Sequence, residues 1–359
     1  MAKGFDQMIS FGSPKAFLGL DIGTSAIKVA LIKKGSPPSL GGFAMVPLPE
    51  GAIVDGSIAD AETVAEFMKE ALAQVAGKGS PVHTALSAQN VIVRFINMPV
   101  MSRDDLDETI KYEAEQYVPY AIDDVSISFE QLTQVESETG AGQLLILLVV
   151  AQKELIGNYM GCLKMAGVVP EVLDVDSLAV LNALHLTIEE QNVVSVIDIG
   201  AGTTNISILK EGVLQFNRSI PIAGNNITMV IQNVLKLDFE QAENVKIEEG
   251  ITVEESDENE VSEVVRTIVE ELASEIRRSF DYYKAQYRES QIDKIILTGG
   301  SAKLKNIDLF LANELGIEVE IGDPLYDLGV DIPDQEELQE KLLELTVAIG
   351  LAMRGVFEQ

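Results

Sequence analysis

The chain has 359 residues, 47% of them hydrophobic, which is enough to bury one large core or two medium-sized ones. Its formal net charge of −31 argues against binding to nucleic acid and against direct docking on an anionic membrane. The single cysteine, Cys162, excludes a framework of internal disulfides, and no run of about 18 apolar residues predicts a transmembrane helix. We therefore expect a soluble cytoplasmic protein.

The first predicted element is a β-hairpin over residues 17–33. An apolar strand enters, the small residues Gly23–Ser25 form a turn, and an alternating strand leaves. A helix is expected to begin after Asp60, which has the side chain of a good N-cap, and a short strand is expected over 83–86.

A small unit is predicted to interrupt this first half of the chain. A helix begins after the N-cap Ser102 and runs to Val118, because Pro119 cannot continue it. The strands of the unit are expected at 91–98, 125–133 and 143–151. This order of strand, helix, strand and strand predicts a small α+β insertion.

The hairpin phrase recurs in the second half of the chain. The segment Val196-Ile-Asp198-Ile-Gly200-Ala-Gly-Thr-Thr-Asn205 aligns without a gap, so that Asp198 matches Asp21, Gly200 matches Gly23 and Asn205 matches Lys28. Such a repeat implies two related halves, each of which offers one glycine turn to a ligand held between them. A long helix is expected later in this half, over about 261–287.

The two turns predict phosphate binding. Successive backbone N–H groups of a small-residue turn form a nest for anions, and an acid before the turn fits if Mg²⁺ lies between it and the phosphate. One turn alone is equally compatible with an ordinary tight hairpin, although two aligned copies favour a ligand. The chain lacks G-x-x-x-x-G-K-[ST], and the stretch from Gly200 to Asn205 lacks the third glycine of G-x-G-x-x-G, which argues against a P-loop and a Rossmann site.

A third glycine turn follows a predicted strand at 295–298. Gly299 and Gly300 stand before a helix expected to begin near Leu304. A glycine pair lets a flat ligand lie against bare backbone, and a helix N-terminus favours an anion. A plain turn between a strand and a helix is the alternative.

Taken together, these elements resemble the actin-like ATPase superfamily, which includes actin, sugar kinases, heat-shock chaperone ATPases and bacterial FtsA-type proteins. Segments 18–31 and 196–209 look like its two phosphate motifs, 295–305 like its adenosine motif, and 174–183 and 345–353 like its connecting segments. The run Gln241-Ala-Glu243-Asn-Val-Lys246 is similar to the A-E-x-x-K of the superfamily. The resemblance implies an α/β fold with two related ribonuclease-H-like halves around a nucleotide cleft.

Within the superfamily, the insertion resembles that of the type IV pilus assembly protein PilM family. That family has an R-x-x-x-x-P strand followed by an E-x-x-x-x-E-A-E-Q-x-x-P helix, and this chain has Arg94 to Pro99 followed by Glu108 to Pro119. FtsA carries an insertion at the same place but continues into an amphipathic membrane-binding tail. The type II secretion L protein continues into a transmembrane helix. Neither continuation is found in this sequence.

The resemblance also implies a division of the chain and a set of site residues. The first half would span 1–90 and 153–190, the insertion 91–152, the second half 191–340 with an outer subdomain near 224–290, and a returning helix 341–359. Phosphates would be held by Gly23, Thr24, Ser25, Lys28, Gly200, Ala201, Gly202, Thr203 and Thr204. Asp21 and Asp198 would hold Mg²⁺ through water. The adenosine side would be lined by Glu243, Lys246, Gly299, Gly300, Ser301 and Lys303. Strand alternation alone would instead turn Lys28 toward solvent.

The implied function is that of a cytoplasmic, ATP-binding scaffold of type IV pilus assembly. It would bind the N-terminal cytoplasmic peptide of the inner-membrane protein PilN at the inner face of that membrane, contact other pilus inner-membrane and motor proteins, and self-associate. Asp198 is the one candidate for activating a water, but the same carboxylate is needed for Mg²⁺, so slow hydrolysis and none both stay open. The alternatives are an FtsA-like filament-forming ATPase and an actin-fold phosphotransferase such as a sugar kinase.

Overall fold

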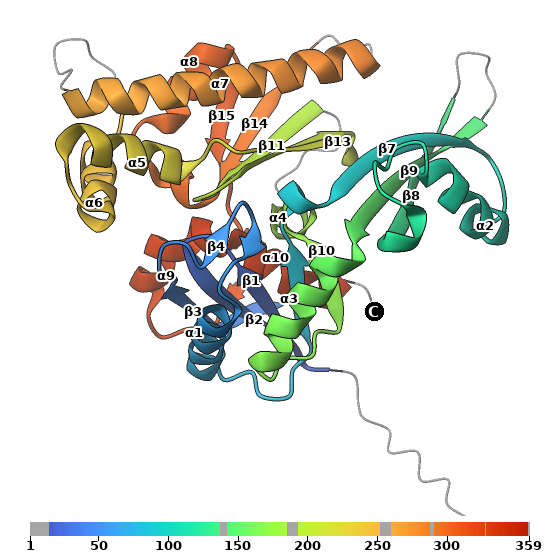
Figure 1. Cartoon of the computed structure of the whole chain (residues 1–359), viewed down its shortest axis with the longest axis horizontal. Coiled ribbons are helices and arrows are strands. Elements are labelled where there is room, and N and C mark those ends of the chain that lie inside the picture. The colour runs from blue at the N-terminus through green and yellow to red at the C-terminus, as the bar shows by residue number, and fades with distance from the viewer. Residues whose placement is uncertain are drawn as a thin grey trace, which may run out of the picture.

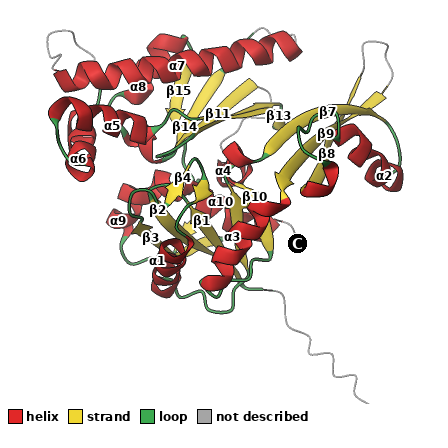
Figure 2. Cartoon of the chain, viewed as in Figure 1, coloured by secondary structure: helices red, strands yellow, loops and turns green. Residues whose placement is uncertain are grey.

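A computed structural model describes residues 14–136, 142–184, 193–251, 260–287, 291–326 and 328–357. It contains two α/β units, each built on one large sheet, with a smaller unit beside them (Figure 1). Figure 2 shows helices on the outer faces of both large sheets. The sequence has an acidic run over 254–260, and residues 254–259 of it lie outside the described residues. No helix in the described ranges has both the length and the apolar character needed to cross a membrane.

The first large sheet has six strands. In spatial order they are β10 (Val172–Val175), β6 (Val82–Leu86), β1 (Ala16–Ile22), β2 (Ala26–Lys33), β3 (Ser39–Pro47) and β16 (Gly329–Val330). The predicted hairpin is confirmed as β1 and β2, which pair antiparallel, whereas β6 runs parallel to β1. A short hairpin of β4 (Ile53–Val54) and β5 (Ser57–Ile58) follows β3.

Helices cover both faces of this sheet because its strands are apolar on both faces. On one face, α1 (Ala61–Gln74) and α3 (Lys153–Met165) pack against side chains such as Leu20 and Val29. Asp60 caps α1 as predicted, since its carboxylate accepts from the backbone N–H of Thr63 at 3.1 Å. Cys162 is buried in this layer as a core thiol. On the other face lie α9 (Gln335–Lys341) and α10 (Thr346–Phe357), which pack against Phe17 and Ile32.

The small unit is a three-stranded antiparallel sheet covered by one helix. Its strands, in spatial order, are β7 (Ile92–Pro99), β9 (Gly142–Gln152) and β8 (Val125–Glu136). The helix α2 (Arg103–Ala114) packs Leu106, Ile110 and Ala114 on one face of that sheet. The predicted end of this helix at Val118 is wrong. Residues 115–117 form a turn instead, and Val118 is not helical because the residue directly before a proline is disfavoured in the helical conformation.

The second large sheet repeats the plan of the first. In spatial order its strands are β13 (Val213–Ile220), β12 (Thr204–Lys210), β11 (Val193–Ile199), β14 (Lys294–Thr298) and β15 (Glu318–Ile321). β13, β12 and β11 pair antiparallel, and β14 and β15 follow in parallel. The first sheet has the same pattern along its strands from β3 to β10. The helices of this unit are α5 (Gly224–Leu235), α6 (Phe239–Glu249), α7 (Glu260–Tyr287) and α8 (Ile307–Leu315). The repeated hairpin thus reflects a repeated sheet topology.

Two helices join the two large sheets. α4 (Asp176–Leu184) and α10 lie between the units in Figure 1, and both contribute to a core with strands β11 and β14. They cross closely, because a Cβ added to Gly350 would lie 1.8 Å from the carbonyl oxygen of Ala179. A second close approach joins α10 to β1, where a Cβ on Gly19 would lie 1.8 Å from the carbonyl oxygen of Ala348. Glycine is therefore required at both crossings.

Candidate functional site

The two glycine turns meet across a cavity between the two large sheets. Each turn is closed by a backbone hydrogen bond that its first glycine donates. Gly23 N donates to Ala26 O at 3.1 Å, and Gly200 N donates to Thr203 O at 2.9 Å. A Cβ on Gly202 would lie 2.6 Å from Thr24 Oγ1. The turns of the two halves are therefore in direct contact.

The cavity behind this contact holds most of the predicted site residues. Those that line it are Asp21, Gly23, Thr24, Ser25, Lys28, Asp198, Gly200, Ala201, Gly202, Thr203, Gly299 and Gly300. Its volume is about 80 Å³, whereas pockets for ligands of nucleotide size measure about 300–1,000 Å³. The measured volume is below that range.

The predicted residues Thr204 and Lys303 are not brought into the cavity. Thr204 is buried in β12, where its hydroxyl donates to the carbonyl oxygen of Ile222 at 2.6 Å. Lys303 does not line the cavity, and its ammonium donates to Glu340 O at 2.6 Å and to Oε1 of the cavity residue Glu344 at 3.1 Å. Neither side chain is free to meet a ligand here.

Asp21 and Lys28 form an ion pair inside the cavity. Lys28 Nζ lies 3.0 Å from Asp21 Oδ2, and the two side chains are only 13% and 11% exposed. Burial acts to lower the pKa of Lys28, but the carboxylates of Asp21, Asp198 and Glu344 outweigh it and raise that pKa. Lys28 is therefore a charged group within the site, and strand alternation was wrong in turning it toward solvent.

The surroundings of Asp198 raise the pKa of its carboxyl group. Burial raises its pKa to about 6, and the nearby charge of Asp21 acts in the same direction. The ammonium of Lys28 and a hydrogen bond from Asn205 oppose this rise. The carboxylate consequently titrates much closer to neutral pH than an ordinary aspartate.

Asp176 is a cavity residue that was not predicted. It begins α4, and one of its oxygens accepts from the backbone N–H groups of Ala88 at 2.8 Å and Ser177 at 2.6 Å. Burial, together with the charges of Asp198 and Asp21, raises its pKa to about 7. The only signal in the sequence was its place at the start of a helix in the first connecting segment, and helix starts often carry aspartate for capping alone.

The third wall of the cavity requires glycine. Gly299 has a φ of 89°, and a Cβ there would lie 2.3 Å from Asp198 Oδ1 and 2.5 Å from Ile199 O. The following Ser301 donates its hydroxyl to Gly200 O at 2.9 Å. The loop after β14 therefore packs directly on the second hairpin, with bare backbone facing the cavity.

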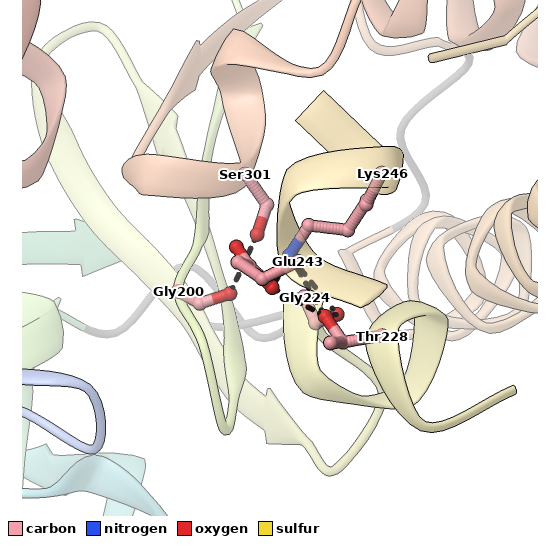
Figure 3. A network of polar contacts seen from close by, with 6 residues as sticks. All are labelled: Gly200, Gly224, Thr228, Glu243, Lys246 and Ser301. Carbon is pink, nitrogen blue, oxygen red and sulfur yellow. Dashed lines mark hydrogen bonds and ion pairs between the residues drawn. The ribbon is translucent and has the colours of Figure 1, made fainter. Parts of the chain in front are cut away.

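Glu243 and Lys246 lie beside the second turn but do not line the cavity (Figure 3). Lys246 is buried, and its ammonium donates to Glu243 Oε2 at 2.7 Å and to Thr228 Oγ1 at 3.1 Å. Burial lowers the pKa of Lys246, although Glu243 opposes this. Gly224 links the cluster to the turn, because its N–H donates to Gly200 O at 3.0 Å.

The residues present fit a hydrated divalent cation better than one held by protein ligands alone. Among the described residues, no group of three or more His, Cys, Asp or Glu side chains is arranged to hold a metal. Glu344 Oε2 is buried at the cavity without a hydrogen-bond partner in the described part of the chain, and the Asp198 carboxylate lies nearby. Mg²⁺ commonly keeps several waters and binds one or two carboxylates together with phosphate oxygens.

A larger cavity of about 580 Å³ lies between β13, α5 and α7. It is lined by apolar side chains and by two arginines and two glutamates, and it contains none of the predicted site residues. Glu275 lies between the two guanidinium groups, with its oxygens 3.0 Å from Arg218 and 2.6 Å from Arg278. These charges are largely satisfied within the protein, so the smaller cavity is the better candidate site.

Comparison with known proteins gives a family match over most of the chain. The family described as "Type IV pilus assembly protein PilM" matches residues 19–356. A solved structure, the PilM-PilN type IV pilus biogenesis complex, contains a chain that is 32% identical and superposes with a TM-score of 0.83. That match covers 95% of this chain and 98% of the other.

More distant relatives share the fold. Cell division protein FtsA of Bacillus subtilis (strain 168) is 27% identical over 360 residues, which cover 88% of this chain and 80% of the relative. MreB 5 of Spiroplasma citri, solved bound to AMPPNP, is 15% identical with a TM-score of 0.54 and covers 97% of both chains. The actin-like fold is thereby confirmed.

Proposed function

Because this chain belongs to the type IV pilus assembly protein PilM family, we propose that it is an ATP-binding scaffold of the pilus assembly machinery. The observation that carries the proposal is the convergence of two homologous glycine turns, Asp198 and the Gly299 loop on one cavity between the two sheets. The third wall, at Gly299 and Gly300, presents bare backbone, which suits a ligand that binds through main-chain N–H groups.

The proposed nucleotide lies across both halves. The turns Gly23–Ser25 and Gly200–Thr204 bind its phosphates through backbone N–H groups other than those of Gly23 and Gly200, which are bonded within the turns, and the ammonium of Lys28 contributes a positive charge. Asp21 and Asp198 hold the water shell of Mg²⁺, which neutralises phosphate charge when it is bound. The adenosine lies toward the other side of the second turn, bounded by Gly299, Gly300, Ser301, Glu243 and Lys246. Lys303 contributes only if its ion pair with Glu344 opens.

Hydrolysis is a separate proposal. Asp198 is the candidate to accept a proton from an attacking water, and a pKa of about 6 suits such a base near neutral pH. The same carboxylate is proposed to hold the water shell of the cation, which leaves it poorly placed to act on a second water. We therefore propose that ATP acts mainly as a ligand that favours one arrangement of the two halves, with slow turnover.

The proposed partner is the N-terminal cytoplasmic peptide of PilN. The support is the 32% identical chain solved in a PilM-PilN complex, which matches almost the whole of this one. Such a peptide would hold the protein at the inner face of the inner membrane, next to other pilus inner-membrane and motor proteins and to further copies of the chain.

Two titrations test the proposal on the intact protein. ATP with Mg²⁺ is expected to raise the melting temperature, since a ligand at 100 times its Kd adds about 2.7 kcal/mol to the free energy of unfolding. Asp198→Ala should reduce that shift, and a shift of equal size would remove Asp198 from the site. A synthetic peptide from the N-terminus of the partner protein should bind at micromolar concentration. If the protein binds ATP but shows no binding of the peptide, the result would favour a filament-forming ATPase or a phosphotransferase.

A further inference from the structure

The duplicated hairpins differ in charge at one position that faces the cavity. In the first hairpin Asp21 pairs across the strands with Lys28, and in the second Asp198 pairs with Asn205. In the first half, therefore, the aspartate lies opposite a positively charged lysine, whereas in the second half the aspartate lies opposite a neutral asparagine. Two acids that align in sequence have unequal surroundings.

The ammonium of Lys28 lies over the first glycine turn. Its Nζ is 3.0 Å from Asp21 Oδ2, and a Cβ placed on Gly23 would be 2.8 Å from the same Nζ. The carboxylates of Asp198 and Glu344 also attract it. The ammonium thus occupies the space between the cavity's acids and the turn proposed to bind phosphate.

Lys28 is also the one positively charged side chain among the described residues that line this cavity. Four carboxylates line it as well, those of Asp21, Asp176, Asp198 and Glu344. Charges interact strongly at a site with little water, so a second cation near Asp21 is repelled by the ammonium. A divalent cation can approach these acids closely only if the ammonium moves.

We propose that Lys28 is an internal counter-ion, which keeps divalent cations out of the nucleotide-free cleft and turns to phosphate when a nucleotide binds. The inference rests on the proposed nucleotide function. Phosphate oxygens held by the Gly23 turn lie within reach of Nζ and attract it away from Asp21. Asp21 then becomes available, together with Asp198, for the water shell of a cation that arrives with the nucleotide. Cation and nucleotide bind together, and the cation does not bind first.

The test uses Mn²⁺ as the probe and the full chain without nucleotide. Free Mn²⁺ is measured by electron paramagnetic resonance during a titration. The wild-type protein is expected to bind Mn²⁺ only weakly, and Lys28→Gln is expected to bind it at least about tenfold more tightly because the repelling charge is gone. Lys28→Arg keeps the charge and should behave like the wild type. Lys28→Gln combined with Asp198→Asn should lose the gain.

Two results would overturn the counter-ion role. One is tight Mn²⁺ binding by the wild-type protein without nucleotide, a measurement that requires no variant to fold. The other is unchanged Mn²⁺ binding by a Lys28→Gln protein whose circular dichroism and melting temperature show that it is folded. Wild-type ATP–Mg²⁺ binding distinguishes the two proposals. A gain of Mn²⁺ binding in Lys28→Gln, with no ATP binding by the wild-type protein, would support the exclusion of cations by Lys28 but overturn its turn to phosphate together with the nucleotide function.

Discussion

Replacing Gly299 with alanine tests the close packing of the third wall on the second hairpin. The backbone there has a φ of 89° and a ψ of 164°, a conformation almost confined to glycine, which costs an L-residue about 1–3 kcal/mol. The new Cβ would also lie 2.3 Å from Asp198 Oδ1 and 2.5 Å from the carbonyl oxygen of Ile199. Relieving such overpacking costs a further 1–3 kcal/mol or so. The expected loss of stability is therefore about 2–6 kcal/mol.

A matched control separates the two contributions. Gly316, at the end of α8, is in the left-handed helical conformation with nothing within 4 Å of an added Cβ, so Gly316→Ala carries only a conformational cost of about 1–2 kcal/mol. Each kcal/mol lowers the melting temperature of a unit of this size by about 2–4 °C, so the overpacking alone should place Gly299→Ala about 2–12 °C below Gly316→Ala, and the less favourable backbone conformation of Gly299 adds to that difference. Differential scanning calorimetry measures the difference. Equal melting temperatures, with equal ATP binding by both variants, would refute the close approach at Asp198.

Three further predictions concern other positions. Asp176 has a pKa near 7 in the folded protein and near 3.8 unfolded, so the folded state binds more protons between these values and loses stability as pH rises through that window. The stability of Asp176→Asn relative to the wild type should therefore rise by up to about 4 kcal/mol from pH 4 to pH 8, as measured by urea unfolding. A difference in stability that does not change with pH would contradict the raised pKa of Asp176. Arg354→Met should cost about 3–5 kcal/mol by leaving the buried Asp174 carboxylate unpaired, whereas Lys33→Met, which breaks an exposed pair, should change little. Gly350→Ala should yield little folded protein, because α4 and α10 could no longer cross, and a normal yield with an unchanged melting temperature would contradict that crossing.

The sequence predicted best what depends on local order. The two hairpins, the caps of α1 and α2 and the long helix α7 follow from alternation, apolar stripes and capping residues, and they form where expected. Short elements were missed. β15 is a four-residue strand at a sheet edge, and α9 is a seven-residue helix whose signal was its cap, Asp334, with acids in the first turn. Elements of this length carry too few residues for periodicity to identify them.

The arrangement of the site was predicted only in part, because its chemistry depends on contacts between distant segments. The glycine turns were identified from their own residues. In contrast, the direction of Lys303 is decided by Glu344, which lies in another element. The raised pKa of Asp176 arises from burial beside Asp198 and Asp21, which no local pattern in the first connecting segment reveals.

The position of α10 has a consequence for synthesis of the chain. β1 leaves the ribosome before the whole second half of the chain, yet one of its faces is covered by α10, which follows that half. The first sheet therefore cannot complete its core until the second half has been synthesised, even though domains usually fold in the order of their synthesis. The second sheet packs on α7 and α8, which come from nearby in the sequence, so it can fold before the first. We expect nascent chains that stop before α10 to protect the second half from protease and to leave β1 open to cleavage.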